Sequence, residues 1–114
     1  MKLLVFILTK TEKLDSLVKE FAKHELTGAT VIKSSGIARK LLQSNDETLS
    51  NIVGSLRKIL NLENVPNNTI FMVIKDEKVS EVTEVIESVV GSLEEPDNGI
   101  VFTLPVDFVK GMKH

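Results

Sequence analysis

Cysteine, tryptophan and tyrosine are absent from this 114-residue sequence, and only five phenylalanines supply its aromatic content. Without cysteine the chain forms no disulfide and offers no thiolate to a metal or a substrate. Because aromatic residues are also few, the core must be aliphatic. An RNA-binding sheet needs exposed aromatic residues and usually a basic surround, so the composition argues against that class.

Charge of one sign is not in large excess either. The formal net charge is −2 and the isoelectric point is near 5.7, so the chain has no basic field for nucleic acid or an anionic membrane. The apolar run at residues 3–8 is too short to span a membrane or to form the core of a signal peptide. We expect a cytoplasmic protein with no nucleic-acid partner and no direct membrane insertion.

Short apolar runs bounded by turn residues predict four strands, at residues 3–8, 29–34, 69–75 and 99–105. The first and third runs are apolar at every alternate position on both faces, which is typical of strands buried on both sides. The last run lies between Asn98-Gly99 and Pro105 and predicts a buried inner strand.

Apolar residues at helical spacing predict two helices, one over residues 14–22 and one over residues 79–90. For the first helix, Thr9 and Glu12 have the spacing of a capping box, and Gly28 is the expected stop. For the second, Asp76 is the expected N-cap, and Gly91 marks the end.

The order strand–helix–strand, given twice, predicts one α+β domain over residues 1–114, a ferredoxin-like βαββαβ sandwich. Residues from about 40 to 68 form an insertion between the second and third strands, and a five-residue apolar stripe predicts a helix within it. This insertion is either an extra packed helix or a mobile arm that docks on a partner. Because two helices cover only one sheet face, a neighbouring copy of the chain is the simplest cover for the other.

Residues suited to catalysis are few. The two histidines, His24 and His114, have no serine or carboxylate residue at a sequence spacing that indicates a catalytic motif. No nucleophile or phosphate-loop motif occurs either. We expect no enzyme activity, no catalytic residue and no metal site. Arg39 stands just beyond a predicted strand and three residues after Gly36, where a guanidinium suits an anionic ligand.

Several stretches, in this order, resemble the PII-type signal-transduction (nitrogen regulatory protein P-II-like) family. Residues 13–15 resemble its Lys-Leu-Asp helix start, residues 26–31 its Val-Thr-Gly-Met-Thr-Val entry to the second strand, and residues 35–39 its Lys-Gly-Phe-Gly-Arg. Residues 79–86 resemble its second helix, and residues 100–106 its Lys-Ile-Phe-Val-Leu-Pro-Val end.

The resemblance implies a homotrimer that binds a nucleotide or another small anion between subunits. It places ligand contacts at Thr30, Gly36, Arg39, Asn98, Gly99 and Lys113. It also implies regulation of a protein target, such as a transporter or a metabolic enzyme, through the 40–68 segment. No permanently bound cofactor is expected.

The sequence departs from the family pattern at positions that hold ATP. Lys40 replaces a glutamine, Ile100 replaces a phosphate-binding lysine, and Gly111 and Lys113 replace two tail arginines. The loop before the last strand is acidic, so we expect at most a mono- or diphosphate nucleotide or another small anion. Two alternatives remain, a structural trimer without a ligand and a protein of the CutA-like type related to divalent metals.

Overall fold

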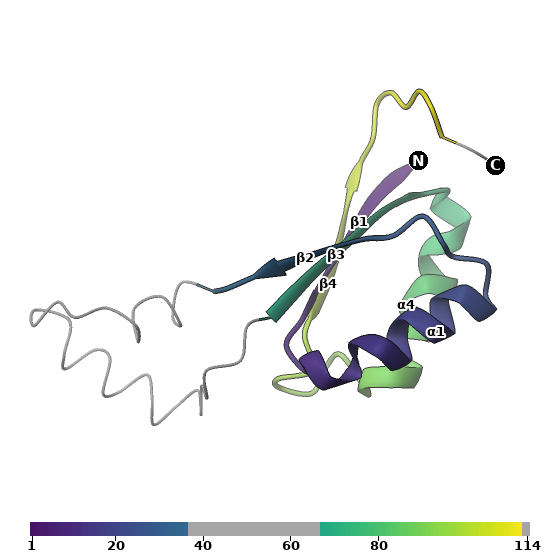
Figure 1. The fold of residues 1–114 in the computed structure, drawn as a ribbon. Helices are drawn as coiled ribbons and strands as arrows, with labels where there is room; N and C mark the ends of the chain where they lie inside the picture. The colour runs from purple at the N-terminus through teal and green to yellow at the C-terminus, as the bar shows by residue number, and fades with distance from the viewer. Residues whose placement is uncertain (37–66, 113–114) are drawn as a thin grey trace, which may run out of the picture.

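The computed structural model describes residues 1–36 and 67–112. In these residues one antiparallel sheet carries two helices on the same face (Figure 1). The elements are β1 (Lys2–Leu8), α1 (Leu14–Lys23), β2 (Thr30–Ser34), β3 (Asn67–Ile74), α4 (Val79–Val90) and β4 (Ile100–Pro105). The predicted α+β, ferredoxin-like arrangement is confirmed. The predicted helical insertion lies outside the described residues up to residue 66, whereas Asn67 and Asn68, predicted as its last residues, begin β3.

The strand order is β2-β3-β1-β4, and all neighbouring strands are antiparallel. Alternate residues of β1 and β3 point to the helices and are buried, as the period of two along a strand requires. The core is aliphatic apart from two phenylalanines and one methionine. Its buried apolar residues are Leu4, Phe6, Leu8, Leu17, Phe21, Leu26, Ile70, Met72, Ile74, Val82, Val85, Ile86 and Val90.

The strand β4 differs from its prediction as a buried inner strand. It lies at one edge of the sheet and pairs only with β1 among the described residues. Ile100, Phe102 and Leu104 are 58%, 44% and 45% exposed. An apolar run is buried by whatever covers it, and no element of the described chain covers these three side chains.

The helix ends also differ from the sequence expectations. The Thr9 hydroxyl does not cap a helix but donates to the Asp97 carbonyl oxygen at 2.6 Å. Asp76 is not an N-cap, since it lies in the 3₁₀ turn Asp76–Lys78 and its carboxylate pairs with the Met1 amino group at 2.9 Å. Helix α1 ends at Lys23, before the expected stop at Gly28.

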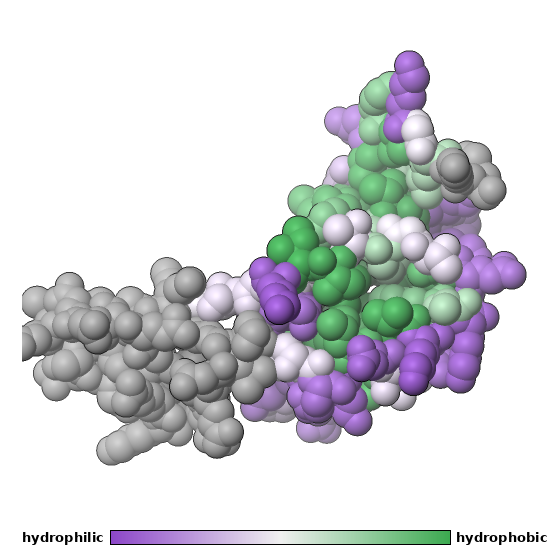
Figure 2. All heavy atoms as spheres, in the orientation of Figure 1, coloured by the Kyte–Doolittle hydropathy of each residue, from purple (hydrophilic) through white to green (hydrophobic). Residues whose placement is uncertain are grey.

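The sheet face opposite the helices, which we call the outer face, is apolar and has no helix over it in the described chain (Figure 1). Cross-strand pairing aligns its side chains in rows, such as Phe71, Val5 and Phe102. The apolar members of the outer face are Leu3, Val5, Ile7, Ile32, Phe71, Val73, Ile100, Phe102 and Leu104. Figure 2 shows hydrophobic residues over the strands and up toward the tail, with hydrophilic residues over the helices.

Candidate functional site

The described part of the chain does not bring the predicted ligand residues together. Thr30 begins β2 opposite Phe71, whereas Gly36 follows the other end of β2, about 20 Å away along the strand direction. Asn98 and Gly99 share the end of the sheet with Gly36 but precede β4, on the opposite edge. Three strand spacings, about 14 Å, separate the two edges. Arg39 and Lys113 lie outside the described residues.

The loop of residues 91–99, before β4, is closed by side chains around it. Asn98 is 7% exposed, and its side-chain amide donates to the Ser92 carbonyl oxygen at 2.7 Å. The Glu87 carboxylate accepts from the Leu93 amide at 3.0 Å, and the Thr9 hydroxyl holds the Asp97 carbonyl. These contacts give the Asn98 side chain a structural role in the single chain.

Gly99 has a separate structural reason to be glycine. Its φ of +105° is a conformation that favours glycine, and a Cβ built there would lie 2.4 Å from the Ile7 carbonyl oxygen. The same Cβ would lie 2.7 Å from the Phe6 ring. A glycine at this position is therefore required by the packing of the loop on β1, whether or not a ligand binds there.

The other end of the sheet carries a cavity of about 750 Å³, which we call the tail cavity. Three segments far apart in the sequence line it: residues 25–30 between α1 and β2, residues 71–78 from β3 onward, and residues 109–112 of the tail. Phe71, Val73 and Met112 provide apolar surface, and Thr30 is the one predicted ligand residue among the lining groups.

Three lysines of the tail cavity were missed by the sequence reasoning. Lys75 and Lys78 follow β3, and Lys110 belongs to the tail. The Lys78 ammonium donates to the Glu81 carboxylate at 3.0 Å, and His24 Nδ1 lies 3.5 Å from the other oxygen of Glu81. The Lys78 hydrogen bond, aided by His24, holds the pKa of Glu81 below its ordinary value.

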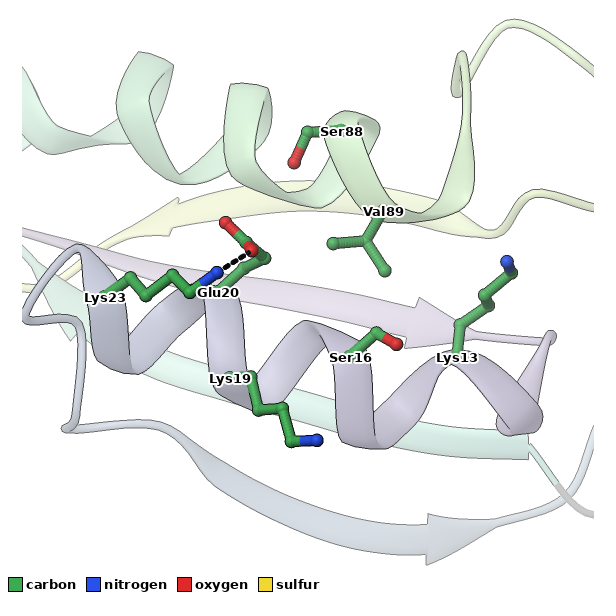
Figure 3. A pocket seen from close by; sticks show the side chains of 7 residues that line it. All are labelled: Lys13, Ser16, Lys19, Glu20, Lys23, Ser88 and Val89. Atoms are coloured by element: carbon green, nitrogen blue, oxygen red, sulfur yellow. Dashed lines mark hydrogen bonds and ion pairs between the residues drawn. The ribbon is translucent and has the colours of Figure 1, made fainter.

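A second hollow, a shallow groove of about 490 Å³, lies between α1 and α4 (Figure 3). Its lysines do not converge: Lys19 points away from α4, and Lys23 pairs with Glu20 of its own helix at 3.1 Å. An exposed pair of this kind contributes little to binding or stability. The groove therefore has the features of a solvated helix surface.

Within residues 1–36 and 67–112, no group of three or more histidine, aspartate or glutamate side chains is placed to hold a metal ion. No helix in this part of the chain is long and apolar enough to cross a membrane. The pKa of Asp76 lies below its ordinary value because the Met1 ammonium donates to its carboxylate. This ion pair joins two strand-end segments and faces solvent.

The family model of the nitrogen regulatory protein P-II matches residues 1–114, the full length of the sequence. The chain belongs to the P-II family. It is therefore a PII-like regulatory protein, from a family whose members are regulators and not enzymes. No curated protein sequence matches the chain.

Family membership confirms the resemblance read from the strand and helix motifs. One sequence signal points to the tail cavity: lysines occur directly after β3 and again in the tail. The signal can be used only once the end of β3 and the start of the tail are known to lie at the same end of the sheet.

Proposed function

We propose that this P-II family member is a sensor that works as a homotrimer, binds a small anionic metabolite or nucleotide between subunits, and regulates a partner protein through the 40–68 segment. The observation that carries the proposal is the outer face. Nine apolar side chains share it, and no described element of the chain covers them. Such a contiguous apolar surface marks an interaction site.

The energy available on this face is large. Fully burying an exposed valine, leucine, isoleucine or phenylalanine contributes about 1.5–3 kcal/mol. Ile32 is 48% exposed and Ile100 58% exposed, so much of this free energy is not used in a single chain. A closed symmetric assembly would use it on every subunit without leaving an apolar surface free. We therefore expect the isolated subunit to be poorly stable.

The same assembly would complete the ligand site. Thr30 lies on the β2 edge, level with the middle of β1, whereas Gly36 and Asn98 lie at one end of the sheet, on opposite edges. Packing copies around a three-fold axis would bring the edges of different subunits together. Arg39, just beyond Gly36 in the sequence, is the proposed anion contact, joined by Lys113 of a neighbour.

Sedimentation equilibrium at micromolar concentration tests the assembly. We expect the mass of a trimer for the wild-type protein and a shift toward monomer for Ile32→Lys, which places a charge on the outer face. Val18→Lys is the matched control, because Val18 is also 48% exposed but lies on α1. A well-folded wild-type monomer, or equal loss of the trimer in both variants, would contradict the proposal.

Regulation would follow from a change in the population of two arrangements of the 40–68 segment. A ligand shifts such an equilibrium only if its affinity for the two arrangements differs. The expected partner is a protein such as a transporter or a metabolic enzyme. A ligand that binds the trimer should change the rate of tryptic cleavage at Arg39 or Arg57, and an unchanged rate at saturating ligand would contradict this mechanism.

The closed 91–99 loop favours one alternative, a trimer that serves only for assembly. Three of its backbone groups already form hydrogen bonds with the side chains of Thr9, Glu87 and Asn98. In the single chain these groups are therefore not available to a ligand. A thermal-shift panel of nucleotides, small carboxylates and divalent metals separates the possibilities. Stabilisation by no compound would favour the assembly protein, and stabilisation by a divalent metal alone would favour the CutA-like type.

A further inference from the structure

The tail after β4 exposes an aromatic side chain. Phe108 is 79% exposed, more than any other large apolar residue of the described chain, and Val109 and Met112 are 36% exposed. These three residues line a hollow of about 290 Å³ together with Met1 and Val106. Aromatic side chains that fill a pocket of a partner supply much of the energy of protein interfaces. In a single chain this aromatic side chain remains in water.

The tail does not bury Phe108 against its own subunit. The Val106 amide donates a hydrogen bond to the Met1 carbonyl oxygen at 3.1 Å, which fixes the direction in which the tail leaves the sheet. Residues 109–112 then line the tail cavity, but Phe108 is not among the lining residues of that cavity. The ring therefore lies outside the cavity that its own tail helps to form, where a second molecule can take it up.

The tail cavity has the properties of a receptor for such a side chain. Phe71 and Val73 of the outer face belong to its lining, so the cavity is continuous with the apolar surface assigned to the interface between copies. It also reaches Thr30 on the β2 edge, whereas Phe108 follows β4, on the opposite edge. One copy thus carries the aromatic side chain after one edge of its sheet and the cavity beside the other edge. Contacts of this head-to-tail kind close into rings.

Charge complements the apolar match. Lys75, Lys78 and Lys110 line the cavity against one carboxylate, that of Glu25. Lys75 and Lys110 are exposed, and the ammonium of a lysine on its flexible stem can follow a carboxylate. The residue directly before Phe108 is Asp107, which is also exposed. The tail therefore presents a ring and an adjacent negative charge, and the cavity presents apolar surface and an excess of positive charge.

We propose that the occupant of the tail cavity is the tail of a second copy of this chain, with Phe108 inserted against Phe71 and Val73 and Asp107 beside the lysines. This inference rests on the proposed function, because it needs the trimer. It deepens that function by naming the side chain that one subunit contributes to the next. It also assigns the tail cavity to contact between subunits, so the small ligand of the trimer binds elsewhere in the cleft.

Cross-linking between two single-cysteine variants tests the contact, since the chain has no cysteine of its own. Gly28 belongs to the lining of the cavity, and a Cβ at this position meets no atom within 4 Å. Phe108→Cys and Gly28→Cys are unfolded, mixed and refolded together, and then treated with a short bismaleimide. We expect a covalent dimer in the mixture and none in either variant alone. The control is Phe108→Cys mixed with Ser16→Cys, because Ser16 lies in the α1–α4 groove.

Each result of the cross-linking decides between the inference and the proposed function. A mixture that sediments as a trimer but gives no covalent dimer, or equal yields with Gly28→Cys and Ser16→Cys, would overturn the inference and leave the proposed trimer standing. Covalent dimers in Phe108→Cys alone would show that the tails meet one another, and would overturn it as well. A monomeric wild-type protein would overturn both.

The strength of the assembly tests the ring separately. In Phe108→Ala we expect the concentration at which half of the trimer dissociates to rise at least about tenfold, the order expected for truncation of an aromatic residue at the centre of an interface. Val18→Ala removes part of a side chain that is 48% exposed on α1 and should change this concentration less than about twofold. Equal effects of the two substitutions would overturn the inference.

A charge reversal tests Asp107 in the same measurement. Asp107→Lys places a like charge beside the lysines of the cavity, and we expect the half-dissociation concentration to rise more than in Glu84→Lys. Glu84→Lys brings the same change in charge at an exposed position of α4. A rise of the same size in both variants would overturn the placement of Asp107.

Fluorescence reports the burial of the ring directly. The chain has no tryptophan, so Phe108→Trp introduces a single indole. We expect its emission to lie at shorter wavelength in the trimer and to move to longer wavelength on dilution, in step with dissociation measured by sedimentation. Emission typical of an exposed indole in a preparation that sediments as a trimer would overturn the inference. Circular dichroism of each variant shows whether a loss of assembly comes from a loss of the fold.

Discussion

The backbone amide of Leu26 donates a hydrogen bond to the carbonyl oxygen of Phe21 at 2.8 Å. The Glu25 amide donates to the Ala22 carbonyl at 3.1 Å, and Glu25 has a φ of +59°. Together these features form a Schellman motif, in which the chain leaves a helix through one left-handed residue. Leu26 and Phe21 are both buried, so the motif also adds an apolar contact to the core.

Glu25→Gly should therefore stabilise the protein. A left-handed backbone costs a residue with a side chain about 1–2 kcal/mol, whereas glycine adopts it freely. The greater freedom of glycine in the unfolded chain offsets about half of this gain, so we expect an increase of about 0.5–1 kcal/mol in the free energy of unfolding. Urea denaturation measures it. Glu25→Ala is the control and should bring no gain, and a loss of stability in Glu25→Gly would contradict the prediction.

Gly99→Ala should destabilise the protein on the order of 3 kcal/mol, because it combines a strained φ with a clash against a strand. The added methyl group would lie 2.4 Å from the Ile7 carbonyl oxygen. Gly28→Ala is the matched control, since a Cβ there meets no atom within 4 Å, and its effect should stay below about 1 kcal/mol. Similar stability of the two variants would show that the loop moves aside at little cost.

Asn98→Ala should lower the free energy of unfolding by about 1–3 kcal/mol in the absence of any ligand. The substitution removes a donor and leaves the Ser92 carbonyl oxygen without its side-chain partner. Ser92→Ala keeps that carbonyl and removes an exposed hydroxyl whose one hydrogen bond, from the Glu94 amide, is long at 3.3 Å, so its effect should be smaller. Wild-type stability in Asn98→Ala would mean that the side chain acts through a ligand and not through the loop.

The ion pair between Lys78 and Glu81 should make stability depend on pH in the acid range. Because the folded-state pKa of Glu81 lies below its ordinary value of 4.5, its carboxylate stabilises the fold above that pH. The contribution disappears as the pH falls through the folded-state pKa. Glu81→Gln should thus lower the melting temperature at pH 7, and this difference from the wild-type protein should shrink in acid, well below pH 4.5.

Glu84→Gln is the control for this pH dependence, since Glu84 is an exposed glutamate on the same helix. The difference between its melting temperature and that of the wild-type protein should stay the same at pH 7 and in acid. A difference between wild type and Glu81→Gln that stays constant down to about pH 3 would show that the pair contributes through packing and not through charge.

The elements of the sheet were predictable because their signals are local. Alternation along β1 and β3 and the helical spacing of Leu17 and Phe21 depend on residues within two turns of one another. The helix ends were not predictable in the same way. The Thr9 hydroxyl has the spacing of a cap, but it bonds to Asp97, which is 88 positions further along the chain.

The edge position of β4 illustrates a different limit. Ile100, Phe102 and Leu104 are as apolar as the residues of a buried strand, and a sequence pattern does not say which partner covers them. The tail cavity could not be predicted from the sequence for a related reason. Lys75 and Lys110 become neighbours of one cavity only through the register of β3 and β4 on β1.

The central place of β1 in the sheet has a consequence for synthesis of the chain. Leu4 pairs with Met72 on one side and with Thr103 on the other, so β1 is synthesised before the other three strands of the sheet but gains both partners only when β4 is complete. Contacts so distant in sequence form slowly, and the waiting strand exposes apolar side chains on both faces. Until β4 has been synthesised and pairs with it, β1 therefore keeps one edge unpaired and open to aggregation.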